Sequence, residues 1–144
     1  MNDVLTPAQR RKNMSHIRAT DTKPELAVRR RLHKLGFRFR LHVRGLPGKP
    51  DLVFPGRRKV IFVNGCFWHS HDCRYGRVVP VTNSEFWAKK RSDTVARDAR
   101  NRRDLQSLGW DVLVVWECRA SNMDVLETEL VDFLSVRRSP GSAA

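Results

Sequence analysis

The segment LPGKPDLVFPGRRKVIFVNG, from Leu46 to Gly65, decides the fold of this 144-residue chain. It holds two short apolar runs rich in β-branched residues, Asp51–Phe54 and Lys59–Val63, separated by Pro55-Gly56. Such runs are typical of strands, and a Pro-Gly pair between them is typical of a turn. We therefore predict a β-hairpin with Asp51 at the start of its first strand.

Helices and a third strand are expected around this hairpin. Residues that favour helix N-termini, such as Thr22 and Ser84, or a glycine that favours a helix end, such as Gly36, mark the boundaries. The expected helices cover 6–18, 24–35, 84–109 and 124–136, and the third strand covers 111–117. A helix that crosses between two strands favours an α/β fold with a mixed central sheet flanked by helices.

The composition favours a polyanionic partner. Lys and Arg number 28 against 15 Asp and Glu, which gives a net charge of +13, and 40% of residues are hydrophobic. The stretch from Lys23 to Lys49 is the most basic part, with a local charge of +8. Nucleic acid is therefore a better candidate than a membrane surface. The length indicates one domain, over 1–136, with a disordered tail at 137–144.

Targeting signals are not expected in this sequence. The longest apolar run, from Val112 to Trp116, is far shorter than the roughly 20 residues of a membrane span. The N-terminus lacks the apolar stretch that a secretory signal needs. We therefore expect a cytoplasmic protein, and in that reducing compartment three cysteines suggest metal binding or catalysis rather than disulfides.

Cysteine and histidine residues predict a structural zinc site. Cys66, His71, Cys73 and Cys118 supply three thiolates and one imidazole, a common closed tetrahedral set. His69 could replace His71, but we expect His69 to remain outside the site. The alternative is three buried free cysteines, which are common in protein cores.

Two aromatic residues, Phe67 and Trp68, lie between the expected zinc ligands, and Trp87 begins the long helical stretch. One of these rings could cover the zinc site. Alternatively, these rings could form a wedge that stacks on or between DNA bases.

The few acidic residues suggest where a catalytic Mg²⁺ could bind. Asp51 heads the hairpin, as in the restriction-endonuclease-like nuclease core of the PD-(D/E)XK superfamily. The usual Glu-x-Lys of the second strand is missing, so that strand offers only a backbone carbonyl, for instance that of Val63. His69 could replace the lysine as a base, with Asp98 orienting it. The alternatives are a turn role for Asp51 and an ion pair of Asp98 with Arg102.

Several motifs together resemble the very short patch repair (Vsr) endonuclease family over roughly residues 10–120. They are KNMS at 12–15, LPGKPD at 46–51, GCFWHSHDC at 65–73, EFW at 85–87, RD at 97–98, GW at 109–110 and VWEC at 115–118. Membership implies a restriction-endonuclease-like fold. It also implies a nick 5′ to the thymine of a T·G mismatch, the product of 5-methylcytosine deamination.

The resemblance also assigns residues to the reaction. It makes Asp51 the Mg²⁺ ligand beside the Val63 carbonyl, and His69 the general base with Asp98 as its partner. Glu25 would hold metal-bound water. Zinc would fall to the four residues already identified. The residues implied to contact mismatched double-stranded DNA are Met14, Phe67, Trp68, Trp87 and Lys90, with residues 1–20 forming a DNA-contacting segment.

One position departs from the family pattern. A histidine usually precedes the Gly-Cys, whereas this chain has Asn64, which can donate a hydrogen bond but cannot carry a proton. This change leaves open a related nuclease with a different mismatch or a modified base as its target. A non-catalytic, zinc-stapled binder of distorted DNA is the alternative outside enzymes. We expect a monomer, with mismatch-repair proteins as possible partners.

Overall fold

The computed structural model describes residues 22–136. The predicted helix over 6–18, Met14 within it and the tail at 137–144 lie outside the described residues.

A four-stranded mixed sheet lies at the centre, in the order β1-β2-β3-β4. Strands β2 (Leu52–Phe54) and β3 (Lys59–Asn64) form the predicted antiparallel hairpin, and β4 (Asp111–Trp116) pairs in parallel with β3. Strand β1 (Arg40–Leu41), antiparallel to β2, was not predicted. Its two exposed residues are too few to show the alternation that indicates a strand. The mixed α/β architecture is confirmed.

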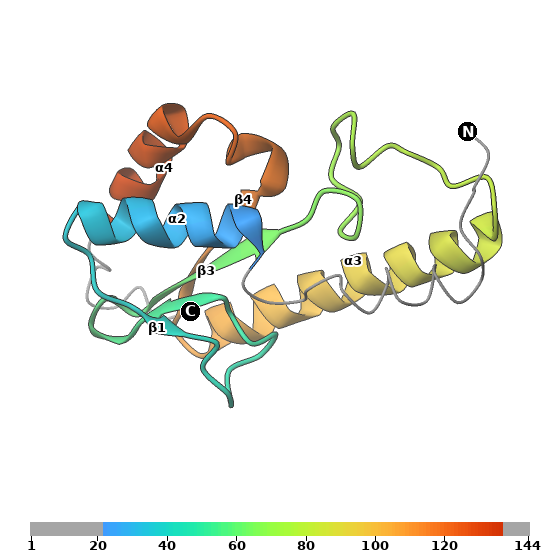
Figure 1. The fold of residues 1–144 in the computed structure, drawn as a ribbon. Coiled ribbons are helices and arrows are strands. Elements are labelled where there is room, and N and C mark those ends of the chain that lie inside the picture. The colour runs from blue at the N-terminus through green and yellow to red at the C-terminus, as the bar shows by residue number, and fades with distance from the viewer. Residues whose placement is uncertain (1–21, 137–144) are drawn as a thin grey trace.

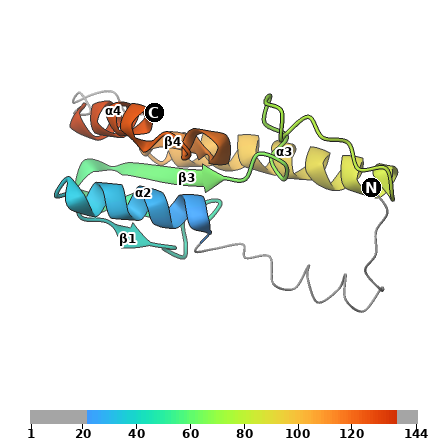
Figure 2. The same cartoon turned by 45° about the horizontal axis from the view of Figure 1, so that its top comes forward.

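Helices cover both faces of the sheet (Figure 1). Helices α2 (Lys23–Lys34) and α4 (Met123–Ser135) lie on one face, and α3 (Ser84–Ser107) runs along the other and continues past the sheet. Figure 2 shows the same layers from a second direction. Alternate strand residues divide between two apolar clusters, because successive side chains of a strand point to opposite faces. Leu52, Phe54 and Ile61 pack with α2 and α4, whereas Val53 and Val60 pack with Leu105 of α3.

The start of α2 is strongly defined by its sequence. Thr22 caps it through a capping box with Glu25, in which each side chain bonds the other residue's backbone N–H. Gly36, with φ 90°, follows the helix end as predicted. Helix α3 is preceded by Asn83 rather than capped by Ser84. Among residues 22–136, no helix is long and apolar enough to cross a membrane.

Candidate active site and metal-binding clusters

A cleft of about 370 Å³ opens between the α3 face of the sheet and α3 itself. Several residues predicted for the reaction line it, from the hairpin, the loop after β3 and the middle of α3. They are Asp51, Val63, Asn64, His69 and Asp98. Other lining residues include His42, Lys49, Asn101 and Arg102. The fold therefore brings together groups that are up to 72 positions apart in the sequence, from His42 to Val114.

Asp51 immediately precedes β2, which begins at Leu52 and not at Asp51 as predicted, and the backbone of β3 satisfies one of its carboxylate oxygens. The Val63 N–H donates to Oδ2 at 2.7 Å. The pKa of Asp51 is raised from its ordinary 3.8 to about 7, chiefly by burial and also by nearby Glu25, against the lowering effects of the Val63 N–H and of Arg29. The contact with Val63 runs through its N–H, and the ligand role of its carbonyl stays a prediction.

Glu25 and His42 lie next to Asp51. One ligand atom from each of the three residues lies within 4.8 Å of the others. Glu25 is 1% exposed, and its Oε1 accepts no hydrogen bond from residues 22–136, although ion-pair distances of 3.2 and 3.3 Å separate it from Arg29 and His42. A buried carboxylate oxygen without a donor, beside a second carboxylate of raised pKa, fits a site for a divalent cation.

His69 and Asp98 are hydrogen-bonded to each other through Nδ1 and Oδ2. The structure thus pairs Asp98 with His69, whereas the alternative expectation was an ion pair with Arg102. The hydrogen bond fixes the orientation of the ring and leaves Nε2 for other chemistry, which is how a carboxylate orients a general-base histidine. Asn64, the last residue of β3, is buried at the same cleft.

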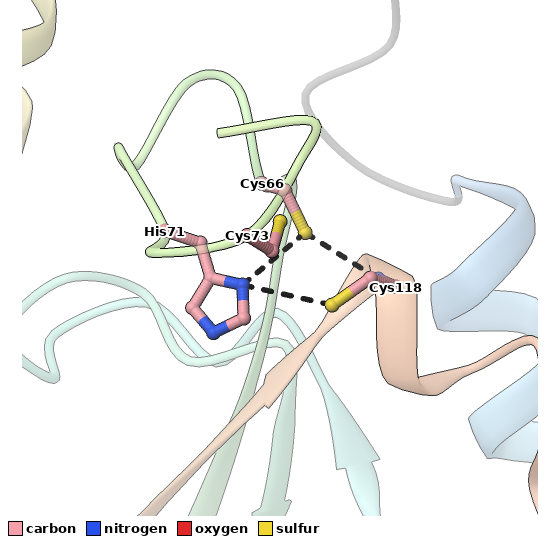
Figure 3. A group of neighbouring side chains, drawn as sticks. All are labelled: Cys66, His71, Cys73 and Cys118. Atoms are coloured by element: carbon pink, nitrogen blue, oxygen red, sulfur yellow. Dashed lines mark hydrogen bonds between the residues drawn. The ribbon is translucent and has the colours of Figure 1, made fainter. Parts of the chain in front are cut away.

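The four predicted zinc ligands converge from two distant parts of the chain (Figure 3). Cys66, His71 and Cys73 come from the loop after β3, and Cys118 follows β4. The Nδ1 of His71 lies 3.7 Å from the Cys66 sulfur and 3.6 Å from that of Cys118. Ligands around one tetrahedral zinc lie about 3.3–3.8 Å apart, so these atoms fit the ion.

The alternative of three buried free cysteines does not match the observed burial. Only Cys66 is fully buried, and Cys73 and Cys118 are partly exposed. Burial raises the pKa of Cys66 to about 12, and the neighbouring thiols of Cys118 and Cys73 act in the same direction, against a backbone hydrogen bond from Cys118. Loading a metal here would therefore release protons, as binding to thiols does in general.

The predicted wedge residues form one half-buried aromatic group. Ring centroids of Phe67, Trp68 and Trp87 lie 5.2–5.7 Å apart with edge-on geometry. The Lys90 ammonium lies 5.8 Å from the Trp68 ring. A further aromatic residue, Trp116, stacks on the predicted zinc ligand His71, at 4.1 Å and 13°.

Arg91 of α3 holds this loop in place. Its guanidinium donates to the carbonyls of Phe67, Gly76 and Val78, with distances of 2.7 and 2.8 Å for the first and last. It also lies 4.5 Å from the centre of the Phe67 ring. The sequence did not single out Arg91, because it is one of several basic residues on α3 and its partners are backbone atoms.

His42 is the other residue that sequence reasoning missed. It lies among the basic residues of the Lys23–Lys49 stretch, nine positions before Asp51, and only the pairing of β1 with β2 places it at the cleft.

The basic Lys23–Lys49 stretch is less available for phosphate than its charge of +8 suggested. Arg29 pairs with Glu25, and Arg31 bonds Asp124 and Glu127 of the α4 N-terminal half.

Comparison with known proteins shows relatives of this chain. A family model of the DNA mismatch endonuclease Vsr matches residues 2–75. The chain is 48% identical over 134 residues to the type II nicking enzyme V.XorIIP of Xanthomonas oryzae pv. oryzae, covering 93% of this chain and 98% of that protein. It is 45% identical over 129 residues to the DNA mismatch endonuclease Vsr of Escherichia coli, covering 90% and 82%.

These matches place the chain among the endonucleases, enzymes that hydrolyse DNA. It belongs to the family of the DNA mismatch endonuclease Vsr. The family predicted from the sequence motifs is thereby confirmed.

Proposed function

We propose that this protein nicks one strand of double-stranded DNA by hydrolysing the phosphodiester 5′ to the thymine of a T·G mismatch. The observation that carries the proposal is the convergence of Asp51, His69 and Asp98 on one cleft. A binder of distorted DNA needs neither a buried carboxylate of raised pKa nor a histidine oriented by a carboxylate. We also propose that the fold is the restriction-endonuclease-like core, in which a Pro-Asp pair precedes the hairpin.

In this proposal Asp51 binds Mg²⁺, with Glu25 beside it to hold a metal-bound water. The pair supplies two adjacent carboxylates, the oxygen ligands that Mg²⁺ prefers. When bound, the ion would neutralise charge that develops on the scissile phosphate. The backbone of Val63 completes this end of the site, through the N–H bond to Asp51 and through the carbonyl proposed as a ligand.

His69 acts as the general base. Its Nδ1 bonds Asp98, so Nε2 takes the proton from the attacking water, and Asp98 stabilises the imidazolium that results. Asn64 lies at the same cleft and donates a hydrogen bond to a phosphate oxygen. Because Asn64 cannot carry a proton, the proton route in this chain runs through His69.

The zinc cluster and the aromatic group support the reaction without taking part in it. Zinc at Cys66, His71, Cys73 and Cys118 ties the loop after β3 to the end of β4. Phe67, Trp68 and Trp87 insert beside the mismatch, where unstacking costs least, and Lys90 contacts a phosphate. The residues assigned to the reaction come together at the cleft and beside Asp51 without a second copy of the chain, and we propose that the enzyme acts as a monomer.

Asn64 favours a second candidate, a nuclease of the same family with another mismatch or a modified base as its target. One experiment separates the candidates. The purified protein, with Mg²⁺, is incubated with end-labelled duplexes that contain T·G, each other mismatch, or a modified base. The proposal expects one nick, 5′ to the T, only in the T·G duplex. Faster nicking of another duplex would favour the second candidate, and binding without a nick in any duplex would favour a non-catalytic binder.

A further inference from the structure

We propose that His42 is a direct metal ligand at the Asp51 site, so that this site prefers a divalent first-row transition-metal ion to Mg²⁺. The inference rests on the proposed function, because it assumes that Asp51 binds the catalytic cation. It adds a nitrogen ligand to a site otherwise expected to consist of oxygen atoms.

The position of His42 supports a ligand role. The Nδ1 of His42 lies 3.9 Å from Oδ1 of Asp51, and the other oxygen of that carboxylate bonds Val63. Two ligands on one ion at about 2.1 Å lie about 3.0–3.5 Å apart, so a shift of a few tenths of an ångström brings both onto one cation. The atom of Asp51 that faces His42 is thus the one that the β3 backbone does not bond.

The surroundings of the other ring nitrogen support the same role. Histidine ligands usually donate their second N–H to a carboxylate, which fixes the ring. The Nε2 of His42 lies 3.3 Å from Oε1 of Glu25, the buried oxygen that accepts no hydrogen bond from residues 22–136. In this structure Arg29 Nη2 donates to Nε2 at 3.0 Å, so Nε2 is the acceptor there, and Arg29 also lies 3.2 Å from Oε1. With Nδ1 on a cation, the ring proton would sit on Nε2, which would then donate to Glu25 Oε1 instead of accepting from Arg29, and the Arg29 guanidinium would pair with Glu25 alone.

The backbone of His42 is held in an uncommon conformation. Its φ is 47°, in the left-handed region that residues other than glycine seldom adopt. Its N–H still donates to the Asp51 carbonyl at 3.4 Å, so His42 remains attached to the strand that carries the candidate ligand. Strain of this kind persists where the surrounding structure imposes it, often at functional sites.

The donor set determines which cation the site prefers. Carboxylates and water suit Mg²⁺, whereas an imidazole adds affinity for the divalent ions of the first transition row, least for Mn²⁺ and more for the ions after it. Two carboxylates and one imidazole should therefore bind Mn²⁺ more tightly than Mg²⁺. Mn²⁺ is also a suitable probe because it competes poorly for the thiolates of the zinc cluster.

The test detects nitrogen on the metal directly and needs no turnover. Mn²⁺ is added to the zinc-loaded full-length protein without DNA. Pulsed electron paramagnetic resonance then reads the ¹⁴N modulation of the bound ion, and titrations give the affinities for Mn²⁺ and, by competition, Mg²⁺. The variant is His42→Asn, because asparagine tolerates the left-handed backbone. His42→Gln is the second variant, and zinc content and circular dichroism report whether each is folded.

Two control variants make the outcomes distinct. His69→Gln removes the other histidine of the cleft, and Asp51→Asn removes the candidate ligand on which the site depends. We expect ¹⁴N modulation in the native protein and in His69→Gln, and its loss in His42→Asn. We also expect Mn²⁺ binding to weaken roughly tenfold or more in His42→Asn, with Mg²⁺ affinity changed less than about threefold.

Each contrary result has a definite meaning. If Mn²⁺ binding depends on Asp51 but the native signal lacks nitrogen, or if nitrogen persists in both folded His42 variants, the ligand role of His42 is wrong and the proposed function stands. If Mn²⁺ binding does not depend on Asp51, the metal role of Asp51 in the proposed function fails together with this inference.

Discussion

Replacing Asp51 by asparagine should stabilise the metal-free protein while abolishing the nicking activity. The native carboxylate is buried, and burial raises its pKa to about 7. Its charged form is therefore costly in the folded state at neutral pH. The asparagine side chain keeps an oxygen for the Val63 N–H and adds an amide that can donate to Glu25, so the substitution removes the charge without leaving an unpaired group.

The size of this effect follows from proton linkage. The pKa of Asp51 is 3.8 in the unfolded chain and about 7 in the folded protein. Between these two values only the folded state holds the proton, so the free energy of unfolding falls by about 1.4 kcal/mol for each pH unit as the pH rises from 4 to 7. Asp51→Asn does not titrate. Its advantage in free energy of unfolding over the native protein should therefore grow by roughly 2–3 kcal/mol between pH 5 and pH 8, and then level off.

The assay is urea denaturation of both proteins from pH 5 to pH 8, with zinc bound and no Mg²⁺ added. The zinc cluster is common to both proteins, so its own pH dependence cancels in the difference. Adding millimolar Mg²⁺ at pH 8 should raise the stability of the native protein and leave Asp51→Asn unchanged, because a ligand stabilises only the state that binds it. A stability difference that does not change with pH would refute the reasoning about Asp51.

Three further predictions concern the parts around Asp51. Cys118→Ser should lose zinc and unfold at a lower temperature, because metal binding and folding are coupled at such sites; elemental analysis and thermal melting check this, and a folded, active protein without zinc would contradict it. His69→Ala should slow nicking by about 10²–10⁴-fold with mismatch binding retained, whereas Asn64→His should nick at least as fast as the native protein; gel assays of rate and binding decide, and normal nicking by His69→Ala would move the base elsewhere. Arg91→Lys should keep the charge but lose the forked contacts to the carbonyls around Phe67, and so should reduce the preference for T·G over T·A duplexes more than it reduces zinc content; an unchanged preference would show that Arg91 is not needed to position the loop.

The fold followed from local sequence signals where those signals were strong. The two runs around Pro55-Gly56 gave the hairpin, and Thr22 with Gly36 gave both ends of α2, because strand periodicity and helix caps act within a few residues. Strand β1 was missed, since Arg40–Leu41 is held by pairing with β2 and has no pattern of its own.

The candidate site divides in the same way. The Cys/His cluster could be predicted because its side chains are few and have one common chemistry. The meeting of Asp98 with His69 could be hypothesised, and the structure brings them into contact. His42 and Arg91 could not be predicted. His42 approaches Asp51 only because β1 pairs with β2, and Arg91 bonds backbone carbonyls of a loop that is distant in the sequence. Neither kind of partner leaves a mark in the sequence.

The most direct measurement is the product of one reaction. The purified protein is incubated with Mg²⁺ and a duplex that carries one T·G mismatch, with each strand labelled at its 5′ end, beside the same duplex with T·A. We predict a single nick in the T strand, immediately 5′ to the mismatched T, none in the T·A duplex, and none with Asp51→Asn. Cleavage of both duplexes at equal rates, or an unchanged rate with Asp51→Asn, would contradict the account.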